Sequence, residues 1–183
     1  MKKVILTTAL TGLLSFSFTL TANQDLILAQ SSQAAQTQIA NVPVAKIGVG
    51  KIRPGISEQE VRRILGRPIS SKTEFIPGIG ENIRTLKYPN ISLSLITHIN
   101  KPNNFFVYQF ISRDRQLPTP TGIKIGDTQA QVIKVYGKPS ISKTGTVTFL
   151  GYSVENKDSV SGGFSFRIEA GKVTEIGYSE PLT

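Results

Sequence analysis

The spacing of apolar residues predicts two short helices. Along each of two stretches, apolar side chains recur at the i, i+3, i+4 spacing that places them on one face of a helix. These residues are Val61, Ile64 and Leu65 in the first stretch and Val132, Val135 and Tyr136 in the second. Each helix is predicted to run for roughly two to three turns and to pack on a core by this face.

Both predicted helices carry the same start and stop signals. Ser57 and Thr128 are placed as N-caps, and each has Glu or Gln three residues later, which predicts a capping box. A Gly-X-Pro tripeptide follows each helix, at 66–68 and at 137–139. Glycine ends a helix in a left-handed conformation without steric penalty, and proline prevents the helix from resuming. We therefore expect the two helices to begin and end by one rule.

After each helix the apolar pattern changes to a period of two residues, which is typical of strands. The stretch "GFSFRIEAGKVTEIGYS" (163–179) predicts a hairpin after the second helix. The stretches "ISLSLITHI" (91–99) and "FFVYQFIS" (105–112) predict the corresponding pair after the first helix. Each hairpin is preceded by one more predicted strand, in "NIRTLKY" (82–88) and in "TVTFLGY" (146–152).

The chain therefore contains one pattern twice. The stretches "GISEQEVRRILGRP" (55–68) and "GDTQAQVIKVYGKP" (126–139) align at an offset of 71 residues. The predicted fold class is α+β, with two tandem copies of a capped helix followed by a three- to four-stranded antiparallel sheet. The copies are assigned to residues 51–112 and 121–180. Residues 113–120 carry charges and two prolines, which is typical of a linker.

In each copy a glycine, a cap residue, a valine and a Gly-X-Pro stop lead into a meander of strands. Each copy is thereby similar to the BamE/SmpA/OmlA family of outer-membrane assembly lipoproteins. Used twice, the unit resembles the tandem fold of beta-lactamase inhibitor protein. The resemblance implies an exported module that binds other proteins. The chain departs from both families because it has no cysteine to carry a lipid anchor or form a disulfide.

The chain begins with the pattern of a secretory signal peptide, two lysines ahead of an apolar run at 4–20. The run is shorter than a spanning helix needs and rich in hydroxyl side chains, so a retained membrane anchor is the less favoured alternative. Cleavage is predicted after Ala29, with Ala22 as the other candidate. Residues 1–29 are thus assigned to a signal peptide and residues 30–50 to a flexible leader. We expect an exported protein, periplasmic or extracellular, and soluble after signal cleavage.

The composition adds a strong positive charge to this picture. The net charge is +9, with 21 Lys and Arg against 12 Asp and Glu. An exported basic protein meets anionic lipid, glycan or acidic proteins, so nucleic acid is not expected as a partner. A general positive bias that only serves solubility is the alternative. With no Cys to form disulfides, the folded part must be stable through its core alone.

Residue types that carry chemistry are sparse. His98 is the only histidine, and no nucleophile-elbow motif accompanies it. The glycines of "GVG" (48–50) lack the strand-then-helix context of a phosphate loop. Glu58 and Glu60 lie in the first turn of a helix, where the helix dipole favours carboxylates. We therefore expect no enzyme, no cofactor and no metal site.

The best candidate for a binding surface is the strand "FFVYQFI" (105–111), which is apolar on both faces. Strict alternation places Phe105, Val107 and Ile111 on one face, with Ile96 of the neighbouring strand beside them. If the other face packs on the first helix, this face is an exposed patch that anchors a partner. The alternative is a patch buried between the two copies.

Arg62 and Arg63 complete the predicted partner-binding residues as a basic flank of the first helix. Two functions follow from these candidates. The first is a protein-binding or envelope-assembly module of BamE/SmpA/OmlA-like type, whose partner is an envelope or secreted protein. The second is a structural envelope protein that binds anionic lipid or glycan through its basic surface. The sequence leaves the oligomeric state open.

Overall fold

The computed structural model describes residues 39–98, 101–156 and 159–182. The predicted signal peptide, residues 1–29, and the first part of the predicted leader lie outside the described residues. No helix in the described ranges is both long and apolar enough to cross a membrane. The described helices and strands all belong to one compact unit.

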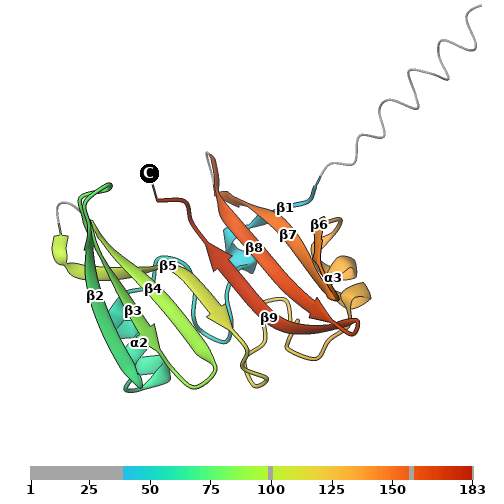
Figure 1. The fold of residues 1–183 in the computed structure, drawn as a ribbon, viewed down its shortest axis with the longest axis horizontal. Coiled ribbons are helices and arrows are strands. Elements are labelled where there is room, and N and C mark those ends of the chain that lie inside the picture. Colours follow the sequence, from blue (N-terminus) through green and yellow to red (C-terminus); the bar gives the residue numbers. More distant parts are fainter. Residues whose placement is uncertain (1–38, 99–100, 157–158, 183) are drawn as a thin grey trace, which may run out of the picture. The chain divides into compact units, whose positions relative to one another are not determined.

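Figure 1 shows how the elements follow one another. The first two are β1 (Asn41–Pro43) and the 3-10 turn η1 (Val44–Lys46). Helix α2 (Glu58–Leu65) then precedes four strands: β2 (Ser70–Ile76), β3 (Glu81–Lys87), β4 (Ile91–His98) and β5 (Lys101–Ser112). Helix α3 (Gln129–Tyr136) precedes four more: β6 (Ser140–Thr144), β7 (Val147–Asn156), β8 (Ser159–Glu169) and β9 (Lys172–Ser179).

The predicted N-caps of the two helices are confirmed. Ser57 and Thr128 have extended backbones, and their side chains accept hydrogen bonds from the backbone N–H of Glu60 and Gln131, each at 3.2 Å. In α3 the Gln131 side chain also accepts from the backbone N–H of Thr128 at 2.8 Å, which completes a capping box. In α2 the Glu60 carboxylate instead accepts from Arg63. The capping box predicted for the first helix is therefore wrong.

Glycine ends both helices, as predicted. The C-cap residues Gly66 and Gly137 have φ angles of 77° and 85°, which a residue with a Cβ adopts only with strain. Each glycine carbonyl accepts a hydrogen bond from a tyrosine hydroxyl in the following strands. Tyr88 donates to Gly66 O at 3.2 Å and Tyr152 donates to Gly137 O at 3.1 Å. The same contact thus fastens the C-terminal end of each helix to the sheet.

The strands do not form two small sheets, one for each copy of the sequence pattern. All nine strands of the described residues belong to one sheet, in the order β1-β7-β8-β9-β5-β4-β3-β2, with β6 also paired to β7. The pairing of β1 with β7 is parallel and makes the sheet mixed. The prediction of two tandem copies of a helix and a small antiparallel sheet is therefore wrong. The described residues form one large mixed sheet with the two short helices α2 and α3.

The two groups of strands merge through β5 and β9. Residues Gln109–Ser112 pair antiparallel with Ile176–Ser179. Across this pairing the rings of Phe110 and Tyr178 pack at a centroid distance of 5.7 Å. Alternation along a strand indicates which residues share a face but not which strand lies alongside. The sequence pattern therefore could not reveal this pairing.

The described part of the predicted leader is ordered structure. Strand β1 pairs with β7, and Val42, Ile47 and Val49 are buried in the core. The backbone N–H of Ala40 also donates to Lys138 O at 2.8 Å. Small β-branched residues are enough to form ordered structure here because the edge of β7 supplies hydrogen bonds and the core supplies apolar contacts. For residues 39–50 the prediction of a flexible leader is wrong.

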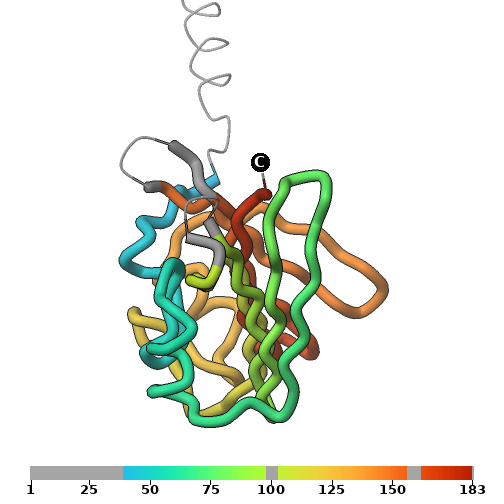
Figure 2. Tube along the Cα trace, turned by 90° about the vertical axis from the view of Figure 1, so that its left-hand side faces the viewer, coloured from blue at the N-terminus to red at the C-terminus, as the bar shows by residue number. Residues whose placement is uncertain are grey.

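Both helices pack on the same face of the sheet. Directly paired residues of neighbouring strands share a face, and one such row is almost fully buried: Leu86, Leu93, Phe110, Tyr178, Phe164 and Tyr152. Val61 of α2 and Val132 of α3 are fully buried against this face. Figure 2 shows α2 on one side of the strands β2 to β4. The opposite face, called here the open face, carries Ser94, Gln109 and Ser179 in the neighbouring row.

Candidate binding groove

The apolar patch predicted on β5 does not form. Phe105 is 6% exposed and Val107 is 1% exposed, and both face the core beneath α2. Ile111 is partly exposed and lies on the open face, where it pairs with Gly177 of β9. The prediction that these three residues share one face is therefore wrong. Phe105 and Val107 are buried, so they cannot serve as the exposed anchors that the sequence pattern predicted.

A β-bulge in β5 is the physical reason. Leu95 pairs with Val107, whereas the adjacent Ser94 pairs with Gln109. Tyr108 is the extra residue between these two pairs. A bulge shifts the alternation of side chains by one residue, so the buried face passes from Val107 to the residue after Gln109. Strict alternation in the sequence gives no sign of this shift.

Ile96 lies on the open face, as the partner of Phe106 in β5. Its side chain is partly buried, and so is that of Ile111 further along the sheet. The four predicted apolar anchors are thus divided between two faces, with Phe105 and Val107 facing the core. The sheet therefore does not bring them together as one surface.

The predicted basic flank carries its own counter-charges. Arg62 forms an ion pair with Glu58 at 2.7 Å, and Arg63 forms one with Glu60 at 2.8 Å. Both pairs join residues three or four positions apart on α2, where such side chains meet. Exposed pairs of this kind contribute little to stability. They do cancel most of the positive charge that the sequence places on this helix.

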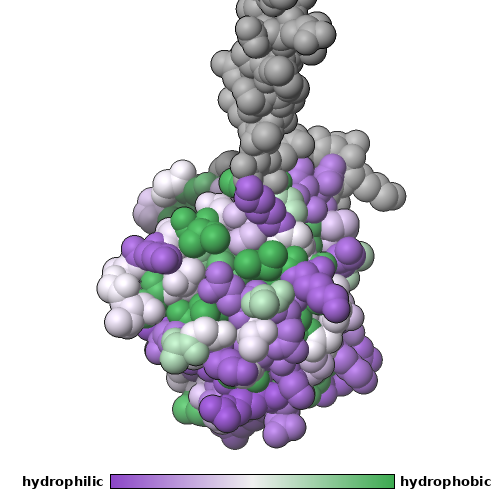
Figure 3. All heavy atoms as spheres, turned by 90° about the vertical axis from the view of Figure 1, so that its right-hand side faces the viewer, coloured by the Kyte–Doolittle hydropathy of each residue, from purple (hydrophilic) through white to green (hydrophobic). Residues whose placement is uncertain are grey.

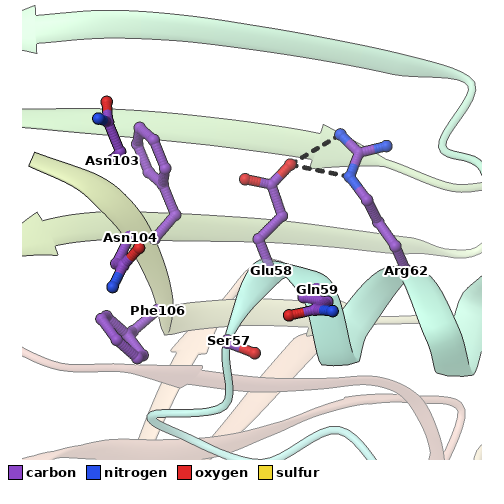
Figure 4. A pocket seen from close by; sticks show the side chains of 8 residues that line it. Ser57, Glu58, Gln59, Arg62, Asn103, Asn104 and Phe106 are labelled. Atoms are coloured by element: carbon purple, nitrogen blue, oxygen red, sulfur yellow. Dashed lines mark hydrogen bonds and ion pairs between the residues drawn. The ribbon is translucent and has the colours of Figure 1, made fainter.

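One groove does combine two of the predicted residues, Arg62 and Phe105. It has a volume of about 550 Å³ and runs between the start of α2 and the start of β5. The lining residues are Ser57, Glu58, Gln59 and Arg62 of the helix side and Asn103, Asn104, Phe105 and Phe106 of the strand side. Figure 4 shows Asn103, Asn104 and Phe106 on the strand side of the groove, next to the first turn of α2 with Ser57 and Glu58. We call this the α2 groove.

Charged contacts fix the floor of the α2 groove. The carboxylate of Glu58 accepts from Arg84 Nη1 at 2.6 Å in addition to its pair with Arg62. The guanidinium of Arg84 lies 3.8 Å from the ring centroid of Phe105, in cation–π geometry. Glu58 therefore connects the first turn of α2 to β3 and, through Arg84, to β5. This network holds the two walls of the groove in place.

The α2 groove offers hydrogen-bonding groups with little net charge. Gln59, Asn103 and Asn104 are exposed, and each amide side chain can both donate and accept. Among the lining residues the charges of Glu58 and Arg62 cancel, and Arg84 in the floor adds one positive charge. Among the described residues no group of three or more His, Cys, Asp or Glu is placed to hold a metal ion. The groove is thus suited to neutral polar groups next to an apolar one.

The sequence did not single out Gln59, Asn103 or Asn104. Polar residues are ordinary in a hairpin turn and on a helix surface, so nothing marked them. Tertiary hydrogen bonds bring them together: Gly55 N donates to Val107 O at 2.7 Å, and Val107 N donates to Ile56 O at 3.0 Å. These bonds lay the segment before α2 against the free side of β5. The groove is a consequence of that pairing.

Large exposed apolar side chains gather at the two edges of the sheet. Ile69 and Phe75, at the β2 edge, are 72% and 58% exposed. Near the β6 edge the exposed residues are Ile39, Val135 and Ile141. Figure 3 shows this end of the molecule, with apolar side chains in the middle of a polar surround. Edges of the sheet, rather than its open face, therefore carry the most exposed apolar surface among the described residues.

Comparison with known proteins gives few matches. No family model matches the chain, and no curated protein matches it. The uncharacterized protein yfeY from Escherichia coli is similar in structure, with 16% identity and a TM-score of 0.42 over 76% of this chain and 99% of that chain. A "putative beta-lactamase inhibitor protein" from Streptococcus mutans has 14% identity and a TM-score of 0.27 over 88% of this chain and 99% of that chain. At these TM-scores neither likeness carries an argument about function.

Proposed function

We propose that the chain is a non-enzymatic protein-binding module whose α2 groove holds a short segment of a partner protein. The observation that carries this proposal is the lining of the groove. Exposed amide side chains lie there beside aromatic rings and an ion pair that cancels its own charge. Such a lining is complementary to a peptide, which presents backbone amides and apolar side chains together.

The hydrogen-bonding groups of the groove support a peptide over an ion. Gln59 and Asn104 can each accept from a backbone N–H and donate to a backbone C=O. The aromatic residues Phe105 and Phe106 also line the groove, where an apolar side chain of the same segment can contact them. The volume of about 550 Å³ falls within the range of about 300–1,000 Å³ usual for ligand sites. A few residues of an extended segment would fill it.

A finer proposal concerns where the partner resides. The signal-peptide pattern of residues 1–29 and the repeated motif support an envelope or secreted protein as partner, with an assembly role of BamE/SmpA/OmlA-like type. N-terminal sequencing of the chain recovered from the envelope fraction tests the export step. We expect the mature chain to begin at Gln30. A membrane-bound product that retains Met1 would contradict it.

A paired-variant capture experiment tests the groove. The tagged full chain is expressed, cross-linked in the cell envelope and purified, and the bound proteins are identified by mass spectrometry. We expect the double variant Gln59→Ala/Asn104→Ala to lose a partner that the unchanged chain retains. Both side chains are exposed, so their removal should change stability by no more than about 0.5 kcal/mol. Gln129→Ala, at the start of α3, is the matched control and should keep the partner.

The alternative, binding of anionic lipid or glycan through the basic surface, makes a different prediction in the same experiment. Attraction of exposed charges fades as salt shortens the Debye length, whereas groove contacts persist. If capture is lost at high salt and is unchanged by the double variant, the lipid or glycan proposal would replace the peptide-binding proposal. The ion pairs of Arg62 and Arg63 reduce the positive charge that lipid or glycan could contact, so they favour the peptide-binding proposal.

A further inference from the structure

The β2 edge of the sheet is open along its full length. Among the described residues β3 is the one strand that pairs with β2, and nearly all residues of β2 are exposed. Figure 2 looks onto this end of the molecule, where β2 and β3 form a long hairpin. An open strand of this length presents a row of backbone donors and acceptors to any strand that can lie beside it. Its side chains decide which strand that is.

Two opposite charges lie on one face of β2. Lys72 and Glu74 pair with Thr85 and Ile83 of β3, so both side chains project from the open face. They form an ion pair with each other at 2.5 Å, with exposed fractions of 75% and 56%. Thr73 lies between them at the middle of the seven-residue strand. Thr73 is therefore the central residue of the strand, with the positive charge of Lys72 before it and the negative charge of Glu74 after it.

We propose that β2 pairs antiparallel with β2 of a second copy of this chain, about a twofold axis through Thr73. In this register Lys72 of each copy lies directly opposite Glu74 of the other. Opposite charges in such cross-strand pairs stabilise a sheet, and the twofold axis forms two of these pairs at once. The two sheets join into one, with α2 and α3 of both copies on the same face.

Other registers of the same two strands are disfavoured by like charges. A slip of two residues in one direction places Glu74 opposite Glu74, and a slip in the other direction places Lys72 opposite Lys72. In-register parallel pairing places both like pairs together. Like charges directly opposite each other destabilise a sheet. The charge pattern of β2 thus selects one register and one direction.

The exposed apolar residues of this edge also gain contacts in the proposed register. Ile69 directly precedes β2, and Phe75 lies near its other end on the helix face, paired with Asn82. Continuing the register by one residue places Ile69 diagonally beside Phe75 of the second copy, and the reverse. Diagonal neighbours are within reach of aromatic side chains. The pairing therefore covers the two large apolar side chains that the single chain leaves exposed at this edge.

The opposite end of the sheet lacks this complementarity. Strand β6, "SISKT", carries Lys143 and no acidic residue. Part of the same edge of β7 is already occupied by β1. Antiparallel self-pairing of β6 would place Lys143 opposite Ile141 and form no ion pair. The β2 edge is thus the end at which a second copy fits.

Sedimentation equilibrium of the full chain, from micromolar to millimolar concentration, tests the proposal. We expect a reversible monomer–dimer equilibrium for the unchanged chain. Glu74→Lys places Lys opposite Lys at both pairs, and Lys72→Glu places Glu opposite Glu. Each variant should weaken dimerisation about tenfold or more. Lys143→Glu, at the β6 edge, is the matched control and should leave the dimer unchanged.

An equimolar mixture of the two variants distinguishes a specific loss of edge pairing from a general loss of structure. The Glu74→Lys chain and the Lys72→Glu chain present opposite charges to each other at both pairs, so an equimolar mixture should form a heterodimer. A single chain with both changes should dimerise with itself. A monomeric mass for the unchanged chain at every concentration would overturn the proposal, and so would a mixture that stays monomeric. Retention of the dimer in both single variants would also overturn it.

Pairing at the β2 edge does not depend on peptide binding in the α2 groove. The α2 groove and the β2 edge involve different residues, and neither Gln59 nor Asn104 belongs to β2. The Gln59→Ala/Asn104→Ala chain should dimerise as the unchanged chain does. The Glu74→Lys chain should retain the captured partner. Failure of one proposal is therefore distinguishable from failure of the other.

Discussion

The two helices start and stop by nearly the same local contacts but are held on the sheet in different ways. Charged contacts attach α2, through Glu58, Arg84 and the ring of Phe105. An aromatic cluster attaches α3. The ring of Tyr136 lies 5.2–5.7 Å by centroid from the rings of Tyr152, Phe164 and Phe166.

The difference can be traced to positions that correspond at the 71-residue offset. Glu58 corresponds to Gln129, and Leu65 corresponds to Tyr136. A tyrosine at the end of α3 fills the space between that helix and the sheet. A glutamate at the start of α2 reaches across to an arginine and leaves the α2 groove beside it. The contrast teaches that one sequence pattern can fix two similar helices that are attached to the sheet by different contacts.

The largest expected effect is in the aromatic cluster. Phe166 is fully buried and lies 4.9 Å by ring centroid from Phe164. Phe166→Ala removes this packing and leaves a cavity, which should lower the free energy of unfolding by about 3–5 kcal/mol. Chemical denaturation of the purified chain measures the change. A loss smaller than that of Glu58→Ala would break the contrast between the two helices.

A smaller effect is expected for the charged attachment of α2. Glu58→Ala removes the acceptor of Arg84 and Arg62, and hydrogen bonds to charged groups contribute about 1.5–3 kcal/mol. The corresponding Gln129→Ala in α3 should change stability by no more than about 0.5 kcal/mol. A double-mutant cycle of Glu58→Ala with Arg84→Ala isolates the coupling. Additive losses in that cycle would mean that the pair does not hold the helix.

The smallest effect at neutral pH is expected for the tyrosines that contact the helix ends. Burial, together with the neighbouring Tyr136, raises the pKa of Tyr152 to about 12 from 10.0. Burial also raises the pKa of Tyr88. Below pH 10 both the folded and unfolded chains hold these protons. Between pH 10 and 12 the unfolded chain loses its Tyr152 proton first, so folding stability falls as pH rises.

Phenylalanine variants test this alkaline loss of stability. Tyr152→Phe removes the hydrogen bond to Gly137 O, at a cost of about 0.5–1.5 kcal/mol at neutral pH. It should also lose less stability between pH 10 and 12 than the unchanged chain. Tyr88→Phe is the matched change in the first half of the sheet. Denaturation midpoints measured across this pH range decide the matter, and identical alkaline losses in all three chains would contradict the assignment.

The sequence predicted most of the local structure because local structure depends on near neighbours in the chain. Ser57 and Thr128 as N-caps, and Gly66 and Gly137 as helix ends, satisfy backbone groups within a few residues. The alternating stretches became strands close to the expected places. Of the candidate binding residues, Arg62 and Phe105 do line the α2 groove.

Tertiary structure alone decided how these elements combine. The pairing of β5 with β9 and the docking of residues 55–57 on β5 join segments far apart in the chain, and the bulge at Tyr108 depends on how β4 and β5 pair. Hydrogen bonds between strands are open to any partner of suitable length, so the choice depends on which apolar faces can be buried together. That choice made one mixed sheet from two repeated patterns, buried Phe105 and Val107, and brought Gln59 and Asn104 to the same groove. The sequence by itself determined the helices, their ends and the strand segments, whereas the joining of the strands into one sheet and the groove arose from contacts between residues distant in the chain, and the resulting strand order left β2 at an open edge.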